Sequence, residues 1–110
     1  MRRPYRFRVP ARWFAVLVHG PSMSPTLRHG DALLVRRGGR VAPGDVVVAR
    51  FRSRPELLVV KRALGERAGG WELRGDNPLI TDDSRRYGMA DVTGRVVLRY
   101  WPRPARIPRS

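Results

Sequence analysis

Short apolar runs, several of them rich in β-branched residues, alternate with glycine and proline along this chain. The clearest run, Val46 to Phe51, follows the turn pair Gly44-Asp45, and Pro55 separates it from the next run, Leu57 to Leu64. Such runs between Gly and Pro are typical of strands. No window of about ten residues has the apolar spacing of an amphipathic helix. The sequence therefore predicts a mostly β fold, a small coiled antiparallel sheet or partial barrel, with strands over residues 11–19, 31–36, 46–51, 57–64, 71–74 and 95–100.

The length of 110 residues accommodates one folded domain and leaves no room for a second. We expect this domain over residues 11–101, between a basic flexible arm at residues 1–10 and a tail rich in Pro and Arg at residues 102–110, which has little to bury. The chain contains no cysteine, which excludes disulfides and thiolate chemistry, and its 2 histidines have no standard metal-ligand spacing. The sequence therefore predicts neither a metal nor a cofactor.

No apolar segment approaches the roughly 20 residues that are needed to span a bilayer. The run from Trp13 to Val18 is also short for the apolar part of a secretory signal. We therefore expect a cytoplasmic protein without a transmembrane anchor, for which the basic residues 2–8 leave peripheral membrane contact open.

The formal net charge of +14 raises the question of an anionic partner. The basic residues are scattered, with clusters only at residues 2–8 and 99–109, which is typical of a solvated basic surface. A basic nucleic-acid-binding β-module is the alternative, and Trp13, Trp71 and Trp101 would be its stacking residues. We expect no specific nucleic-acid partner.

The bend from Gly20 to Leu27 lies between the first two expected strands. Gly20 and Pro21 end the first strand, and Pro25 restricts the residue before it, so the backbone has few conformations. The hydroxyl of Ser22, held on this stiff bend, is a candidate nucleophile. A plain Ser/Pro turn between two strands is the alternative interpretation.

Lys61 is the one lysine among 23 basic residues, and it follows Val59 and Val60 in an expected interior strand. Arginine cannot give up its proton at a usable pH, whereas a desolvated lysine becomes a neutral amine that acts as a general base. Its pKa of about 10.4 must fall by roughly 2 to 3 for this role. The alternative interpretation is a lone surface lysine. It is less favoured once Lys61 is paired with Ser22, because a Ser–Lys dyad is a known way to activate a nucleophile.

Several short motifs, in this order, resemble those of the signal peptidase I family. They extend from residue 19 to residue 97 and comprise Ser22-Met23-Ser24-Pro25-Thr26-Leu27, His29-Gly30-Asp31, Pro43-Gly44-Asp45-Val46-Val47, Val60-Lys61-Arg62, Gly75-Asp76-Asn77 and Asp83-Ser84-Arg85 with Gly88. The short form without an anchor and the run Gly-Asp-Asn-Pro are most similar to the nickel-type superoxide dismutase maturation proteases. The resemblance implies a β-fold endopeptidase that removes an N-terminal propeptide from the dismutase precursor.

The same resemblance implies roles for individual side chains, with Ser22 as the nucleophile and Lys61 as the general base. The supporting residues that it implies are Thr81, as the hydroxyl partner of the lysine amine, Asp76, as the acid of the Gly-Asp-Asn motif, and Asp83 with Arg85, as the ion pair of the active-site loop. Gly20 stands where some bacterial members carry a hydroxyl for the oxyanion. Oxyanion stabilisation is therefore expected from the Ser22 backbone N–H and a neighbouring amide. Without the resemblance, this segment is a charged, turn-rich loop.

Three other interpretations are left open. Signal-peptidase-like processing of a different precursor differs only in its substrate. A self-cleaving repressor-type Ser–Lys peptidase is disfavoured, because only 21 residues precede Ser22. A Ser–His pair with His19 is disfavoured because no carboxylate partner is evident.

Overall fold

The computed structural model describes residues 12–110, and strands form most of its regular structure. The elements, in chain order, are β1 (Trp13–Leu17), β2 (Ala32–Arg37), β3 (Val46–Phe51), β4 (Arg54–Arg67), β5 (Gly70–Arg74), α1 (Ser84–Tyr87), β6 (Ala90–Trp101) and β7 (Ala105–Arg106). The predicted mostly β fold is confirmed.

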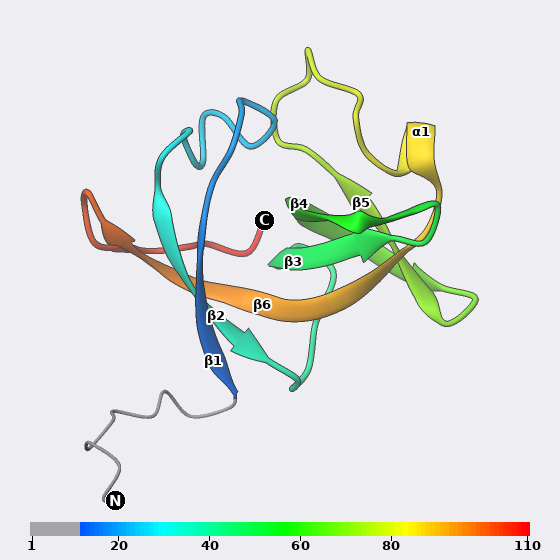
Figure 1. The fold of residues 1–110 in the computed structure, drawn as a ribbon, viewed down its shortest axis with the longest axis horizontal. Coiled ribbons are helices and arrows are strands. Elements are labelled where there is room, and N and C mark those ends of the chain that lie inside the picture. The colour runs from blue at the N-terminus through cyan, green and yellow to red at the C-terminus, as the bar shows by residue number, and fades with distance from the viewer. Residues whose placement is uncertain (1–11) are drawn as a thin grey trace, which may run out of the picture.

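One antiparallel sheet contains all these strands and curls into a partial ring that does not close into a barrel (Figure 1). The order along the sheet is β1-β2-β6-β3-β4-β5, and β7 pairs with β6. The long strand β6 joins the two halves, because it pairs with β2 over one stretch and with β3 over another. A further pairing of Trp71 with Ala90 brings β5 back to β6.

Two clusters of buried side chains fill the curled sheet. The first contains Leu33 and Val35 of β2 together with Met23 and Leu27 from the loop between β1 and β2. The second surrounds Phe51 of β3. Full burial of a Met or Leu side chain contributes about 1.5–3 kcal/mol. The first cluster therefore fastens the β1–β2 loop, which carries Ser22, to the sheet.

Strand bounds differ from the expected ones where tight turns join the strands. β4 begins at Arg54, because Phe51 and Arg54 pair across a short turn, and Pro55 lies on a stretch of β4 that has only β3 beside it. Proline is tolerated on such an edge stretch because no second neighbour needs its N–H. The segment before β6 also contains the short helix α1, which Asp83 caps at its N-terminus.

Residues 102–110 return to the sheet, although the sequence indicated a tail with little to bury. β7 pairs with β6, and Ile107 packs against the first core cluster. The Ser110 N–H donates to the Gly44 carbonyl at 3.1 Å. These contacts are long-range and leave no periodic pattern in the sequence. The expected basic arm at residues 1–10 lies outside the described residues, and none of the helices within residues 12–110 has the length and apolar character to cross a membrane.

Candidate active site

The loop between β1 and β2 holds Ser22 in a fixed position. Met23 and Leu27 are buried in the first core cluster on either side of a turn in which the Leu27 N–H donates to the Met23 carbonyl at 2.9 Å. The Ser22 carbonyl accepts the Asn77 N–H at 2.9 Å, and the Asn77 side chain donates to the Pro21 carbonyl at 3.1 Å. The segment after β5 therefore clamps the backbone of Ser22.

Lys61 lies in β4, where it pairs with Val47 of β3, and its relative exposure is only 5%. Burial lowers the pKa of its amine, because the charged form loses its hydration. The carboxylates of Asp83 and Asp82 act in the opposite direction, and the desolvation outweighs them. Burial thus shifts the pKa of Lys61 in the direction that favours the neutral amine.

Gly75 links the two candidate residues. Arg62 of β4 pairs with Arg74, the last residue of β5. One position further along this antiparallel pair, Lys61 of β4 lies next to Gly75, which follows β5. A Cβ atom on Gly75 would lie 2.6 Å from the Ser22 carbonyl oxygen and 3.4 Å from the Ser22 Cβ. Gly75 therefore contacts Ser22 and lies one position beyond the residue that pairs with Arg62. The hydrogen bonds within residues 12–110 do not include one between the Ser22 hydroxyl and the Lys61 amine.

Asp76 connects β4 with the Ser22 loop. Its carboxylate accepts two bonds from Arg62, at 3.1 and 2.5 Å, and one from the Thr26 hydroxyl at 2.5 Å. Burial alone would raise the pKa of Asp76, but the bonds from Arg62 and Thr26 outweigh it and hold the pKa below its usual value. Arg62 also donates to the Pro108 carbonyl at 2.8 Å, which ties the C-terminal segment to the same network.

Asp83 organises the segment before α1. Its side chain is fully buried and accepts bonds from Arg85, at 3.0 and 2.7 Å, and from the Gly75 N–H at 3.3 Å. Burial would raise the pKa of Asp83, but these bonds keep it below its usual value. The structure therefore brings Asp83 and Arg85 together beside Gly75. Thr81 is exposed, its carbonyl accepts the Asp83 N–H at 2.9 Å, and its pairing with Lys61 stays a prediction.

A hydrogen bond from the Gly20 N–H to Nδ1 of His29, at 2.9 Å, fixes the entry to the Ser22 loop. The sequence places His29 in the motif His29-Gly30-Asp31, and the fold brings its ring against Gly20. Pro21 has no N–H, and the Ser22 N–H has no backbone acceptor within residues 12–110. The Gly20 amide, by contrast, is engaged with His29.

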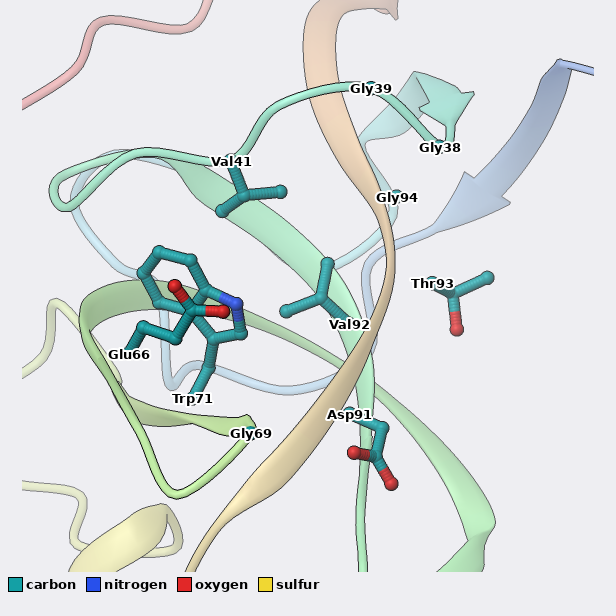
Figure 2. A pocket seen from close by; sticks show the side chains of 10 residues that line it. All are labelled: Gly38, Gly39, Val41, Glu66, Gly69, Trp71, Asp91, Val92, Thr93 and Gly94. Carbon is teal, nitrogen blue, oxygen red and sulfur yellow. The ribbon is translucent and has the colours of Figure 1, made fainter.

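A hollow of about 350 Å³ lies away from this site, between the β2–β3 connection, the turn after β4 and strand β6 (Figure 2). Trp71 and Glu66, which pair across β4 and β5, line it together with Val92 of β6. None of the predicted site residues is among those that line it.

Comparison with known proteins defines the class of protein. Mitochondrial inner membrane protease subunit 1 of Xenopus tropicalis is 32% identical over 114 residues, which cover 79% of this chain and 68% of that protein. Mitochondrial ATP-independent inner membrane protease subunit 1a of Arabidopsis thaliana is 33% identical over 115 residues, covering 77% and 68%. The human subunit 1 is 28% identical over 114 residues, covering 79% and 69%. The protein is a signal-peptidase-like serine protease.

A family model defines the membership more closely. Residues 3–97 match the family described as Peptidase S24-like, and the chain belongs to that family. The expected peptidase activity is thereby confirmed at the level of the class.

The same comparison corrects the predicted location. The relatives are named as subunits of a protease of the mitochondrial inner membrane, which contradicts the expectation of a cytoplasmic protein. That expectation was wrong because it depended only on missing signals: no apolar span and no leader-like segment were found in the sequence.

Proposed function

We propose that this protein is an endopeptidase with a Ser22–Lys61 catalytic dyad, which removes an N-terminal propeptide from a precursor protein. One observation carries the proposal: the only lysine of the chain is buried in β4 with a lowered pKa, one position across the sheet from the glycine that contacts Ser22. Burial of a charged amine without an ion-pair partner costs free energy, so burial favours the neutral amine, which is the form that accepts a proton.

In the proposed reaction, the Ser22 Oγ attacks the scissile carbonyl carbon while its proton passes to the neutral Lys61 Nζ. The carbonyl π pair moves onto the oxygen, and the Ser22 N–H donates to the resulting oxyanion. The Lys61 ammonium then gives its proton to the leaving amine as the C–N bond breaks. Water, deprotonated by Lys61, hydrolyses the acyl-enzyme and returns Ser22 to its starting state.

The supporting residues position this dyad. Asp76 holds the Ser22 loop through Thr26, and Asp83 with Arg85 fixes the segment that bonds to Gly75. We also propose that the Thr81 hydroxyl accepts a bond from the Lys61 amine once a substrate orders this loop. Proximity of this kind matters because small displacements of reacting atoms reduce rates strongly.

The first candidate substrate is the precursor of a nickel-type superoxide dismutase, whose propeptide would be cut while extended. Supporting this choice are the short peptidase domain, proposed for residues 11–101, and the Gly-Asp-Asn-Pro run at Gly75 to Pro78. Processing of a different precursor is the second candidate, and the naming of the relatives as inner membrane proteases supports it. Purified protein incubated with either precursor, with Ser22→Ala as the inactive control, distinguishes the two.

Replacement of Lys61 tests the dyad directly. Arg keeps the positive charge but cannot accept a proton, so we expect Lys61→Arg to be nearly as inactive as Lys61→Ala. The pKa of Lys61 is lowered and its neutral form is the active one, so the wild-type rate should rise as the pH increases through that pKa. The measurement is peptide cleavage over about pH 6 to 10. A Lys61→Arg protein with activity within about tenfold of wild type would exclude Lys61 as the base.

A further inference from the structure

The two arms of the β1–β2 loop are bonded to each other on the way to Ser22. The Val18 N–H donates to the Asp31 carbonyl at 2.9 Å, and the Gly30 N–H donates to the Val18 carbonyl at 2.8 Å. These backbone bonds continue the antiparallel pairing of β1 with β2 beyond the ends of the two strands. The loop that carries Ser22 therefore leaves the sheet from a paired base.

The next cross-link toward Ser22 uses a side chain. The Gly20 N–H donates to Nδ1 of His29 at 2.9 Å, so the imidazole takes the place that a backbone carbonyl has in a strand ladder. Gly20 has a φ of +81°, in the left-handed region that favours glycine. Because glycine has more backbone freedom than any other residue, this bond removes freedom at a position only two residues before Ser22.

Only the neutral imidazole of His29 can form this cross-link. A neutral histidine has one N–H and one nitrogen with a free lone pair, and the bond from Gly20 requires the lone pair on Nδ1. In the imidazolium form both nitrogens carry hydrogen, so Nδ1 can no longer accept. His29 is exposed, so a proton reaches its ring from solvent without rearrangement of the core. Protonation therefore breaks the cross-link.

The titratable and charged groups around His29 come from both arms of the loop and from β6. His19 on the first arm lies edge to face with His29, with 5.6 Å between the ring centroids. Arg28 precedes His29, and Asp31 follows two residues later. The Asp31 carboxylate accepts the Arg28 N–H at 2.8 Å and lies 3.4 Å from a terminal nitrogen of Arg99 in β6. None of the ion pairs within residues 12–110 includes His29, so no carboxylate compensates the imidazolium for the lost bond.

We propose that His29 is a positioning residue of the peptidase reaction, whose neutral imidazole holds the Gly20 backbone and with it the loop that carries Ser22. Protonation of His29 releases this backbone, so acid reduces activity through His29 as well as through Lys61. This inference rests on the proposed Ser22–Lys61 reaction, and it adds a residue that acts through Gly20 rather than on the substrate.

The loss of this one bond should have a moderate effect. The buried side chains of Met23 and Leu27 and the bonds with Asn77 continue to hold the loop. A displacement of about 1 Å at a reacting group costs on the order of a hundredfold in rate, so partial release of the loop should cost roughly tenfold. The loss should appear in kcat rather than in KM, because it concerns the geometry of the attack by Ser22.

Three variants test the role of His29 in the cleavage of a propeptide-spanning peptide. Leucine has no acceptor, so His29→Leu should reduce kcat roughly tenfold. Asparagine carries a side-chain oxygen at the position of Nδ1 and does not titrate, so His29→Asn should restore most of this loss. His19→Asn removes the only other histidine and is the matched control, which should behave like wild type.

The pH profile distinguishes this role from a merely structural one. Histidine side chains change charge between about pH 5 and 8. Over this range, acidification should lower kcat/KM of wild type and of His19→Asn roughly tenfold further than that of His29→Asn, in which only Lys61 titrates. Identical profiles for wild type and His29→Asn would overturn the proposal.

The Gly20 amide gives a second readout that does not depend on cleavage. In NMR spectra of wild type, its proton resonance should move as histidine is protonated, and in His29→Asn it should not. A Gly20 resonance that is independent of pH, or a His29→Leu protein with wild-type kcat, would refute the positioning role while leaving the proposed function intact. Absence of peptide cleavage by wild type would instead refute the proposed function, whatever the Gly20 resonance does.

Discussion

Gly75 offers a sharp test of how the sheet positions Ser22, the proposed nucleophile. In Gly75→Ala, the added methyl would lie 2.6 Å from the Ser22 carbonyl oxygen, whereas ordinary contact begins at 3.4 Å. The two backbones must therefore separate by about 0.8 Å. The near atom is backbone, which Asn77 also holds, so it cannot rotate away as a flexible side chain would. The loop that carries Ser22 therefore has to move.

The expected consequence is a large loss of activity with a smaller loss of stability. A displacement of about 1 Å at a reacting group costs on the order of a hundredfold in rate, so we expect kcat/KM for a propeptide-spanning peptide to fall roughly hundredfold. The overpacking itself should reduce the free energy of unfolding by about 1–3 kcal/mol, which leaves the fold populated. Cleavage kinetics and thermal unfolding on the same preparations separate the two effects.

Gly65→Ala is the matched control, because Gly65 also lies in the sheet but a Cβ there meets nothing within 4 Å. We expect this variant to cleave within about twofold of wild type, since surface substitutions without new contacts are nearly neutral. If Gly75→Ala retained wild-type kcat/KM, the contact between Gly75 and Ser22 would not determine where the nucleophile lies. Equal losses in both variants would point to a general effect of stiffening the sheet.

Two further predictions concern charges around the site. Asp76→Ala leaves the buried Arg62 guanidinium without its carboxylate partner and should cost about 3 kcal/mol in the free energy of unfolding. Glu56→Ala, at an exposed ion pair, should cost much less. The pKa of Asp76 is lowered in the folded protein, so its carboxylate contributes stability above the unfolded pKa of about 4. This contribution is lost as the pH falls toward the folded pKa. The free energy of unfolding should therefore decrease more on acidification in wild type than in Asp76→Ala. Arg85→Gln leaves the charge of Asp83 uncompensated, which should raise the pKa of Lys61 and move the rise of the rate to higher pH; an unchanged pH profile would contradict this.

The sequence was sufficient for much of the fold because strand patterns are local. The run Val46 to Phe51 is a strand with those bounds, since its β-branched residues and the preceding turn signal lie within a few residues of each other. The pairing of β7 with β6 and the contact of Ser110 with Gly44 could not be predicted in this way. They join segments without any periodic signal, and only the three-dimensional path of the chain creates them.

The candidate site likewise combines residues that the sequence predicts with long-range contacts that it does not. Ser22 and Lys61 stand out in the sequence, one for its stiff bend and the other as the only lysine. The contact of Ser22 with Gly75 is not evident from the sequence, because glycine at this position would be assigned to an ordinary turn from local pattern alone. The hydrogen bond from the Gly20 N–H to His29 likewise could not be predicted from the sequence, because histidine at a turn has no characteristic sequence pattern.

The distribution of charged partners explains how Lys61 keeps a lowered pKa in a chain that contains carboxylates close by. The two carboxylates that act on Lys61 are those of Asp83, which bonds to Arg85, and Asp82, which bonds to Arg86. Each carboxylate near the lysine thus already has an arginine, so its attraction for a second cation is weakened. Arginine suits these partner positions because it stays charged when buried and grips a carboxylate with two N–H groups, while only lysine can release a proton at the remaining position. Desolvation is therefore left as the dominant influence on the Lys61 amine, which is the condition that general-base catalysis requires.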